Sequence, residues 1–123
     1  MASFVLVEKS NSNLKPRARI RICDSFACRF RGLMFRRQLP RDEGLLLVGT
    51  RDSRLDSAIH MLFVHFDLAV FWINAAMDIV DKTIARSWRP IYVPARAARF
   101  VLEVHPDLFA EYEIGEKVKF VNA

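Results

Sequence analysis

Two histidines and two carboxylates are the side chains of this sequence best suited to acid–base chemistry. His60 and His65 lie five residues apart, Asp67 follows two residues after the second, and Glu103 lies in a separate apolar run. An imidazole beside a carboxylate can act as a general base or contribute to a metal site. In an extended strand, however, residues 60 and 65 point to opposite faces, which argues against a shared metal ion. We therefore expect neither a metal nor another cofactor.

Glu103 and His60 each allow two interpretations. Alternation within the run 100–104 places Glu103 on the same face as Val101, where an acid needs a partner such as an arginine. An exposed position at the end of a strand explains the residue equally well. His60 lies either at the edge of a pocket, with Arg31 and Glu103 as candidate partners, or on an outer sheet face with water. The candidate binding residues are Arg31, His60, Met61, His65 and Glu103.

Arginines dominate the first third of the chain. Nine basic residues and one acid lie between Lys15 and Arg41, whereas the whole chain has a net charge of +5. Arg17, Arg19 and Arg21 alternate with apolar residues, so one face of a strand would present them to an anionic ligand or a nucleic-acid backbone. A solvated face with ion pairs explains the same pattern. Any nucleic-acid binding is expected to be weak and strongly salt-dependent.

The two cysteines and the apolar segments indicate where the protein works. Cys23 and Cys28 lack a second cysteine pair, which argues against a zinc site, and we expect both to be free thiols. Residues 1–15 lack the features of a signal peptide, so a reducing cytoplasm is expected. The longest apolar run, 61–73, is interrupted by polar residues and is too short to span a bilayer. We expect no membrane partner.

Hydrophobic periodicity predicts the elements that must position these side chains. A period of two over residues 17–22 predicts a strand, and a helical period over 25–35 predicts a short helix that buries Phe26, Phe30 and Leu33. Residues 68–73 and 79–84 are expected to pair as a hairpin. Pro106 is expected to open a second short helix. Further strands are predicted at 45–48, 58–63, 91–93, 99–104 and 117–120.

The length and these elements indicate a single domain over residues 1–123. Several short strands with two short helices and no alternation of strand and helix predict a mainly β fold. The expected architecture is a small antiparallel β-sandwich or barrel of jelly-roll type.

Several segments resemble a known family at matching order and spacing. The first is Arg31-Gly32-Leu33-Met34-Phe35-Arg36, followed by Leu39-Pro40 and Glu43-Gly44-Leu45-Leu46. Further on come Ala58-Ile59-His60-Met61, Ala97-Ala98-Arg99-Phe100-Val101-Leu102-Glu103 and Gly115-Glu116. Over about residues 17–120 the chain is similar to the domain of unknown function family 192. The resemblance implies a small, single, β-rich domain of jelly-roll type, for which no activity is established.

The sequence also departs from the family pattern. Ala69 stands where the family usually has an aspartate, and Asp67 replaces a proline. A role for that aspartate therefore does not transfer to this chain. His105-Pro106 stands where a glycine is usual, so the following turn must be built differently.

Three functions remain open. The first is a module that binds a small molecule or a protein and has no catalysis of its own. The second is a hydrolase or isomerase of a small anionic substrate, with His60 or His65 as base and an arginine holding the anion. The third is a weak nucleic-acid binder that uses the arginine-rich face. The lack of a G-x-S-x-G motif and of a glycine-rich phosphate loop argues against the enzyme. The oligomeric state is open.

Overall fold

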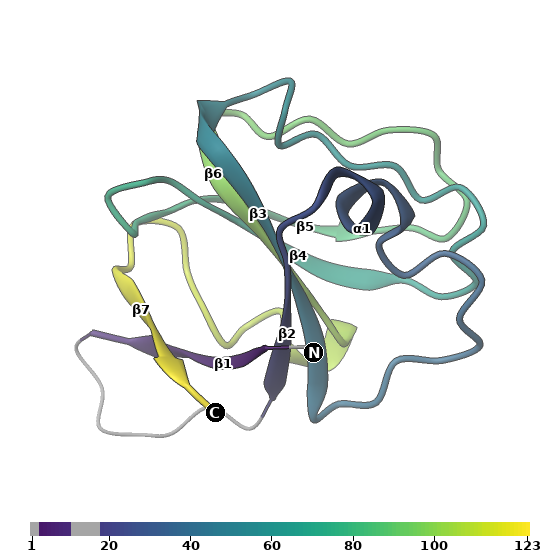
Figure 1. Cartoon of the computed structure of the whole chain (residues 1–123), viewed down its shortest axis with the longest axis horizontal. Helices are drawn as coiled ribbons and strands as arrows, with labels where there is room; N and C mark the ends of the chain where they lie inside the picture. The colour runs from purple at the N-terminus through teal and green to yellow at the C-terminus, as the bar shows by residue number, and fades with distance from the viewer. Residues whose placement is uncertain (1–2, 11–17) are drawn as a thin grey trace.

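Seven strands and two short helices make up a computed structural model that describes residues 3–10 and 18–123 (Figure 1). In chain order the elements are β1 (Phe4–Lys9), β2 (Arg19–Cys23), α1 (Phe26–Arg31), β3 (Glu43–Ser53), β4 (Leu68–Ile73), β5 (Ile79–Ala85), β6 (Ala98–Val104), the 3-10 helix η1 (Pro106–Leu108) and β7 (Val118–Asn122).

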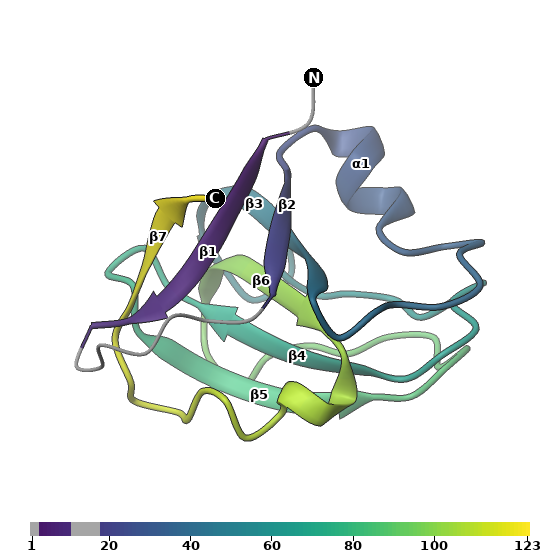
Figure 2. The same cartoon turned by 90° about the horizontal axis from the view of Figure 1, so that it is seen from below.

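All seven strands belong to one sheet, in the order β5-β4-β6-β3-β2-β1-β7. Every neighbouring pair is antiparallel except β2 and β3, which run parallel. The sheet curls into a half-barrel (Figure 2), and side chains of β1 and β7 pack with those of β4 in one buried cluster. The predicted mainly β class is confirmed. The strands form a single mixed sheet, however, rather than the two packed sheets of a jelly-roll sandwich.

The parallel pair was not expected from the sequence. Parallel neighbours need a crossover connection, and here α1 and residues 32–42 provide it between β2 and β3. The predicted hairpin of β4 and β5 is confirmed by their antiparallel pairing. The helix predicted at Pro106 is present as the single turn η1.

The predicted strands at 58–63 and 91–93 are wrong. Between these segments the structure has only an isolated bridge, which pairs Ile59 with Tyr92. Phe63 has a φ of 60°, outside the extended region, so the strand conformation cannot continue through it. Both segments belong instead to long connections at one end of the molecule (Figure 1).

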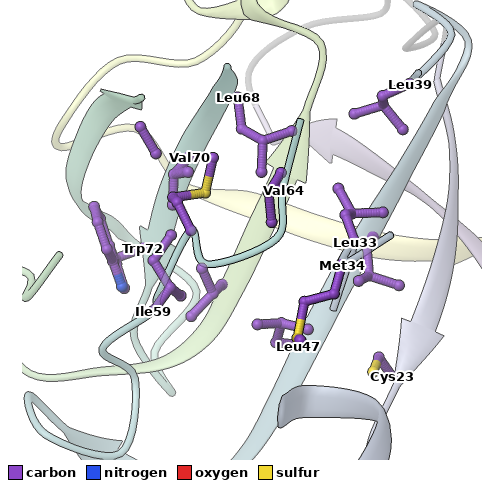
Figure 3. Packing of buried hydrophobic residues seen from close by; sticks show 14 of the residues in the cluster. Cys23, Leu33, Met34, Leu39, Leu47, Ile59, Val64, Leu68, Val70 and Trp72 are labelled. Carbon is purple, nitrogen blue, oxygen red and sulfur yellow. The ribbon is translucent and has the colours of Figure 1, made fainter. Parts of the chain in front are cut away.

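Two apolar clusters cover the two faces of the sheet. Side chains of β4 alternate between them: Leu68, Val70 and Trp72 face one cluster, and the residues between them face the other. Figure 3 shows the first cluster, in which Leu33 and Met34 pack toward the strands. All residues of β4 are buried, because both faces of this strand are covered.

Helix α1 differs from its prediction. Ser25 caps it by accepting a hydrogen bond from the N–H of Cys28, and it ends at Gly32, whose φ is 48°. None of its residues is buried, and Phe26 and Phe30 are exposed. The turn at Gly32 breaks the helical period, so only the apolar residues after it enter the core.

Candidate functional site

A cavity of about 420 Å³ lies against the face of the sheet that carries the first cluster. Residues from α1, the segment 56–61 and strands β3 and β6 line it. Apolar side chains such as Leu33, Met61 and Val101 form much of the wall. A small molecule with an apolar part would therefore find matching surface here.

Glu103 is the buried acid of this cavity. It lies on β6 between Leu45 of β3 and Val70 of β4, and only 4% of it is exposed. Burial raises the pKa of its carboxyl to about 7, because the charged form loses solvation. Among the described residues, no side chain donates a hydrogen bond or forms an ion pair with it. Glu103 thus takes the inward position of the two that were considered. The arginine partner expected for that position is not observed.

His60 is half-buried and lines the same cavity. Its Nε2 lies 2.9 Å from the carbonyl oxygen of Phe30 in α1. A carbonyl oxygen only accepts, so Nε2 carries a proton and donates it. The other ring nitrogen, Nδ1, is buried and has no partner among the described residues. In the neutral ring, Nδ1 is therefore an unused acceptor.

Arg29 supplies a third unpartnered group. Its Nη1 donates to the carbonyl oxygen of Val48, 3.3 Å away, while its Nε is buried without a partner among the described residues. Arg29 also lines the cavity. Arg29 is thus half-buried between β3 and the cavity.

The remaining candidate residues divide between the cavity and other surfaces. Arg31 and the fully buried Met61 line the cavity. His65 is exposed, lies outside the cavity wall and packs against Trp88 with ring centres 5.7 Å apart. Asp67 accepts hydrogen bonds from the N–H of Ser87 and from Arg86, and both lower the pKa of its carboxyl. Within the described residues, no hydrogen bond or ion pair joins Asp67 to His65.

Arg19 and Arg21 line a second hollow on the other side of Arg31. The guanidinium of Arg19 lies over the ring of Phe4, 3.9 Å from its centre. Arg31 and Arg36 face the same hollow, so four arginines meet there. Arg17, the third arginine of the predicted face, lies outside the described residues.

The predicted free thiols are wrong, because Cys23 and Cys28 form a disulfide. Their Cα atoms are 5.5 Å apart, within the usual range for such a bond. The bond joins the end of β2 to α1, since the cap at Ser25 turns the chain back within a few residues.

Two features are absent from the described residues. Within residues 3–10 and 18–123, no group of three or more His, Cys, Asp or Glu side chains could hold a metal ion. No helix in this part of the chain is long and apolar enough to cross a membrane.

Comparison with known proteins places these features in a family. The family model DUF192, described as Uncharacterized ACR, COG1430, matches residues 6–120. The chain belongs to this family. It is 32% identical over 98 residues to a UPF0127 protein of Thermococcus kodakarensis, covering 80% of this chain and 60% of that one. It is 30% identical over 120 residues to a UPF0127 protein of Pyrococcus abyssi, covering 96% and 98%. This DUF192 chain thus spans about three fifths of the T. kodakarensis relative and nearly all of the P. abyssi one.

Two crystal structures share the fold. A protein of unknown function from Novosphingobium aromaticivorans superposes with a TM-score of 0.82 at 20% identity, covering 94% of this chain and 84% of that one. A protein from Sinorhizobium meliloti, described as a "putative transcription regulator", superposes with a TM-score of 0.83 at 17% identity, covering 98% and 94%. At these identities the likeness concerns the fold alone.

The segments that carry the DUF192 resemblance meet at the cavity. Arg31 and Gly32 come from the first, His60 and Met61 from the second, and Glu103 from the third. A Cβ built on Gly32 would lie 3.8 Å from Oε1 of Glu103, so the end of α1 and the buried acid are neighbours. Arg29 is the polar residue that sequence reasoning missed. No spacing in the sequence indicated it, because residues two apart on a helix do not face each other.

Proposed function

We propose that this protein is a ligand-binding module without catalysis of its own, whose ligand occupies the cavity at Glu103. The convergence of unpartnered polar groups supports this most directly. His60 Nδ1 and Arg29 Nε are the two buried side-chain atoms of the described residues that lack a hydrogen bond, and both residues line the cavity with Glu103. A buried polar group without a partner costs about 1–3 kcal/mol, so a ligand that satisfies these groups would stabilise the fold.

The same groups define the ligand that would fit. Neutral His60 offers an acceptor at Nδ1, and Arg29 offers a donor at Nε. Glu103 accepts when ionised and donates when protonated, and with a pKa of about 7 both forms are populated near neutrality. The proposed ligand has a polar head with both a donor and an acceptor, and an apolar body that contacts the wall of the cavity.

The test is a ligand screen with matched variants. A library of small acids, amides and amino alcohols is screened against the wild-type protein by ligand-observed NMR, and hits are measured by calorimetry. His60→Phe removes the unpartnered Nδ1, and Glu103→Gln replaces the buried carboxyl by an amide that cannot ionise. Each is expected to weaken binding at least about tenfold, as for the loss of a buried hydrogen bond. Glu116→Gln is the control, because that carboxylate lies outside the cavity wall.

The outcomes separate binding from catalysis. A hit that is recovered chemically unchanged and bound less tightly by both cavity variants supports the proposal. A hit that the wild-type protein converts, and that Glu103→Gln does not, supports a hydrolase or isomerase instead. Hits that bind all four proteins equally would show that the cavity is not the site.

A second candidate function is binding of an anion at the arginine hollow. Arg21 and Arg31 form no ion pair with any acid among the described residues, while Arg36 pairs with Glu43 at 3.5 Å. Unpaired guanidinium groups that share a hollow suit a phosphate or carboxylate. Titration with phosphate and with a short single-stranded oligonucleotide at two salt concentrations tests this. Arg21→Gln is expected to weaken binding, and added salt is expected to reduce it steeply.

A further inference from the structure

Three aromatic side chains contact one another in a row on the surface, outside both hollows. We call Phe35, Phe63 and Trp88 the aromatic ladder. The ring centres of Phe35 and Phe63 are 5.1 Å apart, and those of Phe63 and Trp88 are 5.0 Å apart. Their exposed fractions are 61%, 41% and 47%, so the row faces solvent although its members touch. Adjoining exposed rings of this kind form a surface on which a partner could pack.

The backbone is strained at the three residues that carry these rings. All three residues have positive φ, at 66°, 60° and 66°, a conformation that bulky side chains rarely adopt. Phe35 N–H donates to the carbonyl oxygen of Phe63, and Trp88 N–H donates to that of Met61, each at 2.9 Å. The three connections are thereby fixed to one another. Strained residues that persist in a folded chain occur preferentially at functional sites.

Exposed apolar residues concentrate at this end of the molecule. Of the ten large exposed hydrophobic side chains among the described residues, nine lie in α1 and in the connections 32–42, 54–67 and 86–97. These connections gather at the same end in both cartoon views (Figures 1 and 2). The tenth is Ile114, in the segment that leads to β7. The surface therefore has one apolar end.

Charge is concentrated on the same segments. Residues 26–42, 54–67 and 86–97 contain nine arginines and three aspartates, an excess of six positive charges against +5 for the whole chain. Arg37 and Arg89 flank the ladder in sequence, are exposed, and form no ion pair with any described acid. Basic side chains around exposed aromatic and aliphatic groups complement an anionic lipid surface.

We propose that the aromatic ladder docks this protein on an anionic membrane surface, with its rings in the interfacial layer and Arg37 and Arg89 at the lipid phosphates. Exposed aliphatic residues on the same connections, such as Leu62 and Ile91, favour lipid over nucleic acid, because aliphatic groups cannot stack on bases. Phe63 also stacks on Phe35, so one face of its ring is already occupied by a side chain of the protein. This attachment is peripheral and is independent of the ligand proposed for the cavity.

Vesicle sedimentation tests the proposal. The full chain is mixed with vesicles of phosphatidylcholine alone or of phosphatidylcholine with phosphatidylglycerol, at low and high salt. We expect binding to the anionic vesicles that salt weakens, and none to the neutral ones. Trp88→Gly is expected to reduce binding at least about tenfold, since one large side chain leaves the interface. Glycine accepts the positive φ of this position, so the variant keeps the fold.

Matched variants separate vesicle binding through the aromatic ladder from unspecific electrostatic attraction. Arg37→Gln with Arg89→Gln is expected to weaken binding by roughly fivefold for each arginine. Lys117→Gln with Lys119→Gln removes the same charge near β7 and is expected to change it much less. Ile114→Ser is the apolar control, and Glu103→Gln is expected to bind vesicles like the wild type.

Four results would overturn the proposal. One is a wild-type protein that stays in solution with anionic vesicles at low salt. Another is equal loss of binding in the ladder and β7 variants, which would indicate unspecific charge attraction. Ladder-dependent binding of a single-stranded oligonucleotide without vesicle binding would assign the surface to nucleic acid. A dimer that Trp88→Gly converts to a monomer would assign it to a second copy of the chain.

Discussion

Strand β4 differs in burial and in backbone conformation from the end of the molecule that α1 and its neighbouring connections form. Every residue of β4 is buried, and the strand is paired on both edges. Helix α1 has no buried residue, and the connections 32–42, 54–67 and 86–97 carry exposed rings with positive φ. The two buried side-chain atoms without a partner among the described residues also belong to this end. Regions that break local rules while the rest of a chain obeys them are where function is expected.

The comparison predicts very different costs for removing a phenylalanine in each region. Phe71 of β4 is fully buried against Tyr112, with ring centres 5.1 Å apart. Phe71→Ala is expected to lower the free energy of unfolding by about 3–5 kcal/mol, because it leaves a cavity. Phe35→Ala, in the ladder, is expected to change it by less than about 1 kcal/mol. Urea denaturation measures both, and similar losses would contradict the division into two regions.

Glu103 should make stability depend on pH. Its pKa is about 7 in the folded protein and near 4.5 in the unfolded chain, so the folded state holds more protons between these values. Stability should therefore be greatest below about pH 5 as far as this group contributes, and should fall as the pH rises toward neutrality. The expected loss is on the order of 3 kcal/mol.

The control for this effect is Glu103→Gln, which cannot ionise. Its stability advantage over the wild type should grow between about pH 5 and pH 8 and then level off. Urea denaturation across this range measures the difference. A constant difference between the two proteins would show that the carboxyl of Glu103 is solvated or paired in solution.

The disulfide should contribute most to the stability of α1, the helix that buries no residue. Because α1 buries no residue, the Cys23–Cys28 bond, the cap at Ser25 and the hydrogen bonds from His60 and Arg29 hold it. Reduction is expected to lower the free energy of unfolding by about 2 kcal/mol, as for a short closed loop. Amide exchange should accelerate in α1 and stay slow in β4. Two free thiols in the denatured, unreduced protein would contradict the bond.

Much of the sheet could be predicted, because the sequence of each of these strands by itself indicates a strand. Residues 68–73, 79–84 and 99–104 have the composition and length of strands, and each matches an observed strand within one residue. The single sheet could not be predicted, because the parallel pairing of β2 with β3 depends on how α1 crosses over. Periodicity describes one segment at a time and does not specify which neighbour it will pair with.

Only part of the candidate site could be predicted from the sequence. Alternation with Val101 gave the inward face as one of two interpretations of Glu103, and the structure has it buried. The unpartnered atoms of His60 and Arg29 depend on how α1 packs across the sheet, which no local pattern encodes. The disulfide was missed for the same reason. The two cysteines come together at the turn that Ser25 caps, and the sequence pattern does not specify how close that turn brings them.

Two substitutions at positions with positive φ, Gly32→Ala and Trp88→Gly, are expected to have small effects on stability. Gly32 ends α1 with a φ of 48°, and a Cβ added there would meet nothing closer than 3.8 Å. Gly32→Ala should therefore lose about 1–2 kcal/mol of stability through backbone strain alone, without a clash. Trp88→Gly should change stability by less than about 1 kcal/mol, because relief of strain at its φ of 66° offsets the lost contact with Phe63. Thermal and urea denaturation of both variants measure the pair. If Trp88→Gly were the more destabilising change, the ladder would be a structural element that holds the connections together. If it were the milder one, as we expect, the tryptophan is kept at this strained position for what it contacts outside the molecule.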